Sequence, residues 1–289
     1  MMPDNRSSPP VRKSALIAPL VIAAVVALLF VGVFVMRGAP DESESPPPAP
    51  ITPVTPAPDL PPKATAPLTR SDLISRASEA AAAYAAGVPL PAPKDPMVGR
   101  RFSLRIPFGC LGPQAGAGLS HAYYEYDPVK KTIRLVARPG IWTTFPLVQD
   151  LNKPEEIEAV EGFWVPRPWS NSEACPPNRD GPIPVTPTPA AAQTLGLARI
   201  FEKDGSRVLR RDGRAYEFVR KIGEGDDAPL AHSYRLVLEG HLEGYGDGRA
   251  VRCWAESADH RPVCFYAVAF DRVAFEDASS GAMLAEWRE

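Results

Sequence analysis

The longest run of hydrophobic positions lies near the N-terminus, over residues 15–36. It contains 22 residues and no charged side chain. As a helix it would measure about 33 Å at about 1.5 Å per residue, enough to cross a hydrocarbon core of about 30 Å. The pattern therefore predicts a transmembrane helix at residues 15–36, behind a short stub of residues 1–14.

Charges beside this run predict its orientation. Arg6, Arg12 and Lys13 precede it, whereas acidic residues dominate the segment after Arg37. Basic flanks stay in the cytoplasm, so we expect a cytoplasmic N-terminus and an exported chain beyond the span. The alternative is a removable signal peptide. Its hydrophobic part is usually about 7–15 residues long and ends at a small-x-small pattern, and this run does not fit that description.

A helical period recurs between Thr69 and Gly87. Thr69 suits the N-cap, Asp72 stands near the positive end of the helix dipole, and Gly87 suits a left-handed stop. We expect one short soluble helix within residues 69–87, over about residues 70–86. Its thin apolar stripe indicates either a helix lying lightly on the domain or a surface for a partner, and consists of Leu73, Ile74, Ala77, Ala81 and Tyr84.

From residue 97 onward the hydrophobic period changes from 3.6 to 2, which is typical of half-buried strands. Residues 263–270 are apolar on both faces and indicate a central strand. The fold class expected is mainly β, a sandwich or partly open barrel. The strands predicted lie at about residues 102–108, 122–126, 133–137, 234–242, 250–255, 263–270, 273–276 and 283–287.

Two proline-dense tracts divide the chain. Eleven of its 35 prolines fall between Pro40 and Pro67, so residues 38–68 form either a semi-rigid polyproline II spacer or a disordered tether. The second tract, residues 176–189, is either a linker between two lobes or a surface arm. As a linker it would separate β-rich lobes at residues 97–175 and 190–289.

Four cysteines in an exported region predict two disulfides. Cys253 and Cys264 lie on strands expected to be neighbours in an antiparallel pair, where opposed Cα atoms come within about 4.5–5.5 Å. That pairing leaves Cys110 with Cys175.

Charge and motifs exclude several functions. The chain carries 32 Lys and Arg against 34 Asp and Glu, and most of the first 37 residues' charges are basic, so the exported part is mildly acidic. This argues against nucleic-acid binding. The four histidines are scattered, Gly118–Ala122 lacks the final glycine of a nucleophile elbow, and Gly244–Gly248 reads as a turn. We therefore expect no cofactor, no metal site and no catalytic residue.

Two segments remain as candidate binding sites. Phe163, Trp164, Arg167 and Trp169 crowd a short proline-containing stretch that forms either a platform for a glycan or peptide, or part of the core. The second is a basic run that could meet an anionic wall polymer or an acidic partner, or could be merely solvated. It comprises Arg207, Arg210, Arg211, Arg214, Arg220 and Lys221.

The order of stub, span, proline spacer and disulfide-bearing β domain is similar to that of envelope assembly and secretion accessory proteins of Gram-negative bacteria. This layout implies a single-pass inner-membrane protein with a periplasmic, non-catalytic domain that binds an envelope protein or the cell wall. The alternative is an envelope hydrolase for cell-wall or glycan material. Its carboxylates would come from Glu155, Glu156, Glu158 and Glu161, facing the aromatic stretch.

Overall fold

The structure is a computed structural model that describes residues 65–88, 95–114, 121–151, 153–177, 193–223 and 232–289. The stub, the expected membrane span 15–36, nearly all of the spacer and most of the tract 176–189 lie outside these residues. Within the described ranges no helix is long and apolar enough to cross a bilayer. All of them belong to one compact unit, Pro62–Glu289.

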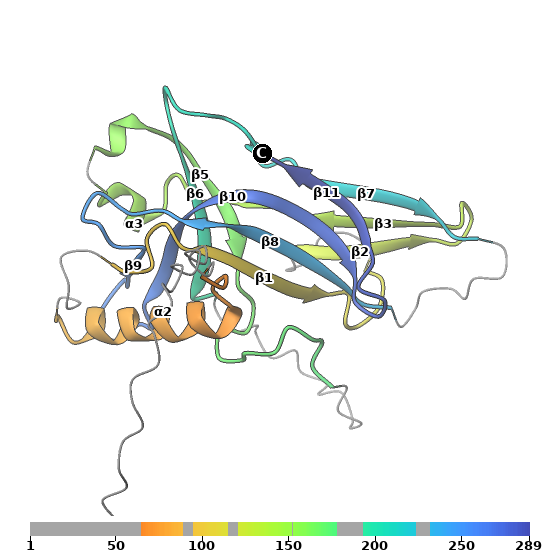
Figure 1. Cartoon of the computed structure of the whole chain (residues 1–289), viewed down its shortest axis with the longest axis horizontal. Helices are drawn as coiled ribbons and strands as arrows, with labels where there is room; N and C mark the ends of the chain where they lie inside the picture. The colour runs from red at the N-terminus through yellow and green to blue at the C-terminus, as the bar shows by residue number, and fades with distance from the viewer. Residues whose placement is uncertain (1–64, 89–94, 115–120, 152, 178–192, 224–231) are drawn as a thin grey trace, which may run out of the picture. The chain divides into compact units, whose positions relative to one another are not determined.

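The expected soluble helix is present as α2, Arg70–Ala85 (Figure 1). Thr69 is its N-cap, and the carboxylate of Asp72 accepts a hydrogen bond of 2.7 Å from the Thr69 amide, which completes a capping box. Gly87 has a φ of 64°, as a left-handed stop requires. Leu73, Ile74 and Ala77 are buried, so most of the apolar stripe packs into the domain. Tyr84, at the other end of the stripe, remains exposed.

Two further helical turns were not expected from the sequence. They are the four-residue helix α3, Pro146–Gln149, and a 3₁₀ turn over Pro154–Glu156. Both begin with a proline, which has a backbone angle suited to the first helical position. Turns this short contain too few residues to show a hydrophobic period.

Within the described ranges eleven strands form two sheets, so the expectation of a mainly β fold is confirmed. The larger sheet has the order β1-β8-β10-β6-β5-β4, with β9 and β11 also paired to β10. Its strands are β1 Arg101–Phe108, β4 Gly140–Ile141, β5 Ile157–Trp164, β6 Leu195–Glu202, β8 Tyr234–Leu242, β9 Val251–Trp254, β10 Val263–Asp277 and β11 Met283–Arg288. The smaller sheet, of order β2-β3-β7, contains β2 Ala122–Asp127, β3 Thr132–Ala137 and β7 Tyr216–Lys221.

Strand β10 is the centre of the larger sheet and is longer than its sequence pattern indicates. Its first half pairs with β9 and β6, and its second half pairs with β8 and β11. The two apolar stretches expected as separate strands, 263–270 and 273–276, are therefore one strand. The register shifts between Phe270 and Arg272, and this bulge accommodates the polar Asp271 without ending the strand.

Strands on opposite sides of the proline tract 176–189 pair directly. β1 is antiparallel to β8, and β5 is antiparallel to β6. The segments 97–175 and 190–289 thus build a common sheet and a common core, instead of the two separate lobes expected from the tract.

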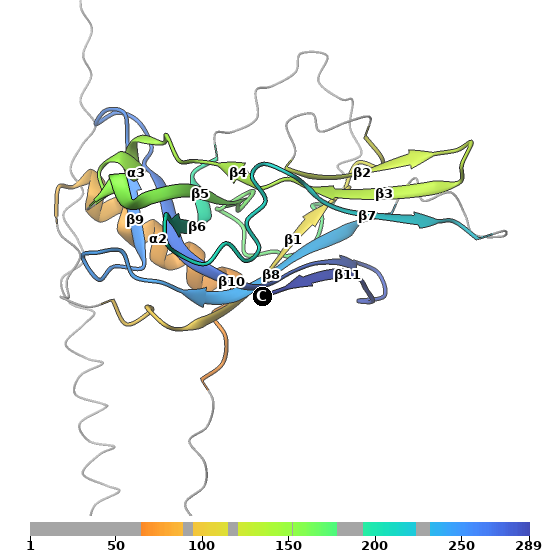
Figure 2. The same ribbon diagram turned by 90° about the horizontal axis from the view of Figure 1, so that it is seen from above.

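Aromatic side chains hold the two sheets together, and Figure 2 shows the smaller sheet as a layer apart from β8 and β11. Tyr216 of the smaller sheet packs edge-on against Trp287 of β11, with ring centroids 5.0 Å apart. Tyr124 packs in the same way against Tyr234 of β8, at 5.1 Å. Both contacts cross from one sheet to the other, so the two sheets pack against each other through aromatic side chains.

Both disulfides are confirmed. Cys110 is bonded to Cys175, and Cys253 of β9 is bonded to Cys264 of β10 in directly opposed positions of the antiparallel pair. The first bond ties the end of β1 to the segment that follows β5. The second fastens β9, the four-residue strand at the edge of the sheet, to the central strand.

Candidate binding cleft

The aromatic stretch at the end of β5 divides between core and surface. Phe163 is 3% exposed and belongs to the main core, whereas Trp164 packs against Trp142 and Phe265 in a smaller cluster. Trp169 is 61% exposed. The aromatic rings therefore do not form the shared platform that the sequence suggested, and most of them stabilise the fold.

Arg167 helps to hold the segment after β5 in place through its backbone carbonyl. Its carbonyl oxygen, together with those of Pro166 and Ser170, accepts hydrogen bonds from the guanidinium of Arg70. Arg70 is the first residue of α2 and is 2% exposed. The segment after β5 is thus fastened to the start of α2 by one buried cation.

The basic run is also largely structural. Its loop, residues 207–214, lies over β5, and the buried carboxylate of Glu161 accepts hydrogen bonds from the amides of Arg211 (2.9 Å) and Asp212 (2.8 Å). The guanidinium of Arg211 donates to the carbonyl of Ala215 and lies over the ring of Tyr216, 4.7 Å from its centroid. The Glu161 carboxylate and the Arg211 guanidinium thus hold the loop at residues 207–214 in place.

Two other arginines of the run are paired as well. Arg210 forms ion pairs with Glu158 and Asp212, and hydrogen bonds from Arg210 hold the pKa of Glu158 below its ordinary value. Arg214 donates to the carbonyl of Arg211. The structure brings Arg210, Arg211 and Arg214 together in one loop, and among the described residues none of them hydrogen-bonds to or stacks on the exposed Trp169.

Replacement of the buried Glu161 by glutamine is expected to lower the free energy of unfolding by about 2 kcal/mol, because one of the two loop amides bound to it would face an NH₂ group and lose its acceptor. The measurement is urea unfolding of the full-length chain. Glu155→Gln is the matched control, since Glu155 is exposed, and it should change the free energy by less than about 0.5 kcal/mol. Equal stability of the two variants would contradict this role of Glu161.

The carboxylates that the hydrolase hypothesis requires are occupied in the same way. Glu161 binds two amides, Glu158 binds Arg207 and Arg210, and Glu156 pairs with Lys153. Glu155 is exposed on the 3₁₀ turn. No two of these carboxylates face Trp164 across a cleft, since Trp164 is turned into the smaller aromatic cluster.

A histidine and an aspartate do meet at the turn between β10 and β11. His232 contacts the carboxylate of Asp277, which also accepts hydrogen bonds from the hydroxyl and amide of Ser279. Burial would raise the pKa of Asp277, but the hydrogen bonds from Ser279 and His232 outweigh it and hold that pKa well below its ordinary value. The serine thus binds the aspartate and not the histidine, so this is a turn-stabilising arrangement and not a nucleophile–base pair.

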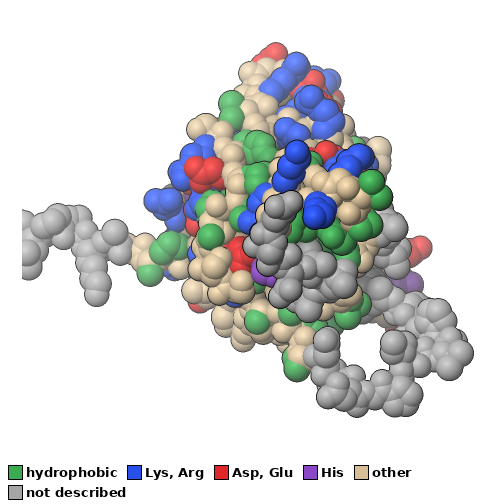
Figure 3. Space-filling model, turned by 90° about the vertical axis from the view of Figure 1, so that its right-hand side faces the viewer, with side chains coloured by type: hydrophobic (Ala, Val, Ile, Leu, Met, Phe, Trp, Pro, Cys, Tyr) green, Lys and Arg blue, Asp and Glu red, His purple; other side chains and the backbone are tan. Residues whose placement is uncertain are grey.

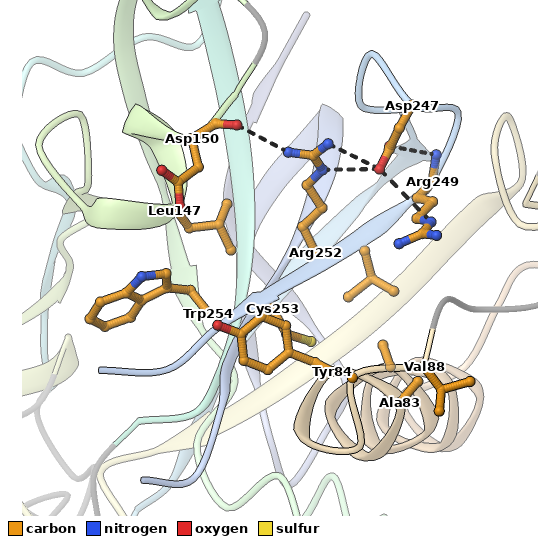
Figure 4. A pocket seen from close by; sticks show the side chains of 13 residues that line it. Ala83, Tyr84, Val88, Leu147, Asp150, Asp247, Arg249, Arg252, Cys253 and Trp254 are labelled. Atoms are coloured by element: carbon orange, nitrogen blue, oxygen red, sulfur yellow. Dashed lines mark hydrogen bonds and ion pairs between the residues drawn. The ribbon is translucent and has the colours of Figure 1, made fainter. Parts of the chain in front are cut away.

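An open cleft lies elsewhere, between α2 and β9, with a volume of about 500 Å³. That volume falls within the range of about 300–1,000 Å³ typical of ligand pockets. Figure 4 shows the side chains that line it. It is lined by Ala80, Ala83, Tyr84, Gly87 and Val88 of α2 and the residues after it, Leu147 and Asp150 near α3, Asp247 and Arg249 of the β8–β9 loop, and Val251, Arg252, Cys253 and Trp254 of β9.

One wall of the cleft carries charged side chains, and their charges are paired with one another. Arg252 donates to the carboxylate of Asp247 through two nitrogens, at 3.0 and 3.2 Å, and to the carbonyl of Asp150 at 3.4 Å. Arg249 is 3.8 Å from the same carboxylate. With Asp150 the cleft carries two acidic and two basic side chains, so it is formally neutral.

The helical wall is apolar. Ala83, Tyr84 and Val88 lie on the C-terminal turns of α2 and the residues that follow, and Figure 4 shows them at the helical side of the cleft. Tyr84 is 44% and Val88 57% exposed. On the opposite side Trp254 packs edge-on against Phe145, with ring centroids 5.6 Å apart. Exposed apolar side chains in a concave, neutral site are typical of binding surfaces.

The sequence did not single out this cleft. Its residues come from segments about 170 positions apart, and none belongs to a recognisable motif. The one available signal was the apolar stripe of α2, for which a partner surface was one of two interpretations. Tyr84, the last residue of that stripe, forms part of the cleft, whereas Leu73, Ile74 and Ala77 are in the core and Ala81 packs against it.

A second surface is strongly charged. Figure 3 shows Lys and Arg side chains gathered over the side of the domain where β2, β3 and β7 end. Lys131, Arg220 and Lys221 are exposed at this end. Acidic residues are interspersed: Asp127 pairs with Lys130, and Glu217 with Arg134. This mixture of charges is typical of a solvated surface, so the cleft is the stronger candidate site.

Within the described residues no group of histidine, cysteine and carboxylate side chains is arranged to hold a metal ion. The cleft therefore offers apolar contacts and hydrogen bonds.

Comparison of the chain with protein-family models, with curated proteins and with solved structures finds no match.

Proposed function

We propose that this chain is a single-pass inner-membrane protein whose exported, disulfide-bonded β domain binds a protein partner through the cleft between α2 and β9 and catalyses no reaction. Two disulfides are consistent with an oxidising compartment. The apolar run at residues 15–36 supports the membrane anchor, and its basic flank supports a cytoplasmic N-terminus.

The observation that carries this proposal is the open, formally neutral cleft with exposed Tyr84 and Val88 on its rim. The carboxylates that the hydrolase alternative would use are engaged in holding the loop at residues 207–214 and the 3₁₀ turn. We therefore propose binding as the single function.

The test is recovery of the full-length chain from washed membranes, followed by gentle solubilisation and purification. We expect the chain in the membrane fraction, with a stable partner. The variant Ala83→Arg places a long cation in the cleft and should abolish recovery of that partner. Ala82→Arg is the matched control, because Ala82 is the neighbouring exposed position and does not line the cleft.

Three results would overturn the proposal. Recovery of the chain in the soluble fraction would contradict the proposed membrane anchor. Recovery of the wild-type chain without any partner would contradict the proposed binding function. Equal recovery of the partner by wild type and Ala83→Arg would show that the cleft is not the binding site.

A further inference from the structure

The cleft exposes one edge of β9, and the pairing of β9 with β10 shows which backbone groups point into it. In an antiparallel pair, residues alternate between positions bonded to the partner strand and positions bonded outward. Ala250 accepts a hydrogen bond from the amide of Ala267 at 3.0 Å, so position 250 faces β10. Positions 252 and 254 then also face β10, and positions 251, 253 and 255 face outward.

Two independent contacts agree with this alternation. The amide of Cys264, opposite Cys253, donates away from β9 to the carbonyl of Thr194, at 2.9 Å. The amide of Ala255 donates outward to the hydroxyl of Tyr84, at 3.2 Å. The outer edge of β9 therefore faces the C-terminal turns of α2 across the cleft.

The outward groups differ in how well they are covered. Val251 is 1% exposed, because α2 packs over it. Cys253 is half-buried and lines the cleft. Its amide and carbonyl have no backbone or side-chain hydrogen bond among the described residues. Unpaired groups on a strand edge are the binding element for an added strand.

The hydroxyl of Tyr84 occupies the position that an added strand would take at Ala255. A phenolic oxygen can accept one hydrogen bond as a peptide carbonyl does, but it cannot continue the ladder to Cys253. The alanines at positions 80 and 83 and the glycine at 87 leave room between helix and strand. The volume of about 500 Å³ is that room.

The chemistry of the cleft also specifies its occupant. Asp247 is neutralised by Arg249 and Arg252, so a charged ligand gains little there. Leu147 and Trp254 offer apolar contact on the side away from the helix (Figure 4). The groups presented are thus a strand edge and apolar side chains, which complement an uncharged, extended polypeptide.

We infer that the partner binds by adding an extended, mainly apolar segment as a strand to the outer edge of β9. This inference rests on the proposed function, binding through the cleft. The amide of the added segment donates to the carbonyl of Cys253 and its carbonyl accepts from the amide of Cys253. The disulfide to Cys264 keeps this edge fixed on the central strand. The carbonyl of the next outward-bonded residue replaces the Tyr84 hydroxyl at Ala255.

The test uses a phage-displayed library of linear nine-residue peptides, selected on the full-length chain in detergent and counter-selected on Ala83→Arg. Synthetic copies of selected peptides are then N-methylated at one backbone amide at a time. We expect losses of affinity of about fivefold to tenfold at alternate positions and little change between them, because one strand edge bonds to β9. Binding should change little with salt, since the cleft is neutral.

Two variants sharpen the test. Tyr84→Phe keeps the ring but frees the Ala255 amide, so the peptides should bind several-fold more tightly. Ala82→Arg should bind as wild type does.

The outcomes separate strand addition from the proposed function. If Ala83→Arg abolishes peptide binding but N-methylation has no alternating effect, the cleft binds its partner in another way and only strand addition fails. If no peptide distinguishes wild type from Ala83→Arg while the membrane partner does, strand addition of a linear segment also fails. Self-association of the chain that Ala83→Arg abolishes would make a second copy the occupant and overturn the inference.

Discussion

Removal of the Cys110–Cys175 disulfide is expected to lower the free energy of unfolding by about 4 kcal/mol, and removal of Cys253–Cys264 by about 3 kcal/mol. The difference follows from loop length, because the first bond closes 65 residues and the second closes 11. A longer closed loop restricts the unfolded chain more. The relevant variants are Cys110→Ala/Cys175→Ala and Cys253→Ala/Cys264→Ala.

The contacts around each disulfide in the folded chain also predict a larger loss for Cys110–Cys175. Cys110 follows β1, and the carboxylate of Glu173, two residues before Cys175, accepts a hydrogen bond of 3.1 Å from the amide of Arg105 in β1. The segment after β5 is therefore held to β1 by this bond as well as by the disulfide. Cys253 and Cys264 instead lie on strands already joined by ladder hydrogen bonds.

Urea unfolding of both variants in the full-length chain, without reductant, measures the two losses. Wild type under reducing conditions should lose more than either variant, since both bonds are then broken. Equal losses, or a larger loss from Cys253→Ala/Cys264→Ala, would contradict the dependence on loop length.

The strands whose side chains alternate between apolar and polar were predictable from the sequence. β1 and β8 show a period of 2 over most of their length, and the turn between β2 and β3 has the composition of a turn. The helix α2 was predictable because Thr69 and Gly87 mark its two ends. Each of these signals lies within a short stretch of chain.

Strands β5 and β7 carried misleading signals. Glu161 is buried in β5 because two loop amides bind its carboxylate, so a charged residue occupies a core position. Arg220 and Lys221 end β7, and in the sequence they read as part of a basic run. A pattern of polarity cannot show that a distant loop satisfies a carboxylate, so neither strand was predicted from the sequence.

The cleft was beyond sequence reasoning for a different reason. It exists because α2, more than 160 residues earlier in the chain, packs beside the edge of β9. Its key chemical groups are the backbone amide and carbonyl of Cys253, which leave no trace in residue type. The disulfide at the same residue was predictable, because opposed cysteines on neighbouring strands are a side-chain signal.

Replacement of Arg70 by methionine is expected to lower the free energy of unfolding by about 3 kcal/mol. Methionine keeps an apolar stem of similar reach but leaves the carbonyls of Pro166, Arg167 and Ser170 without their donor. Part of this loss is offset. Burial, together with the charge of Arg167, lowers the pKa of Arg70, so removal of the buried cation recovers some desolvation energy.

Two substitutions separate charge from geometry. Arg70→Lys retains the charge but loses the planar fork that reaches several carbonyls, so its loss should lie between wild type and Arg70→Met. Arg101→Met, at an exposed position of β1, is the matched control and should change stability by less than about 0.5 kcal/mol. Urea unfolding of the full-length chain measures all three.

A second measurement locates the effect. The segment after β5 carries the exposed Trp169, a cleavage site for chymotrypsin, and Arg70 fastens the residues on both sides of it. Arg70→Met should therefore speed cleavage after Trp169 under native conditions, while the Cys110–Cys175 bond still holds the end of the segment. Loss of global stability without faster cleavage at Trp169 would show that Arg70 acts on α2 alone and does not anchor this segment.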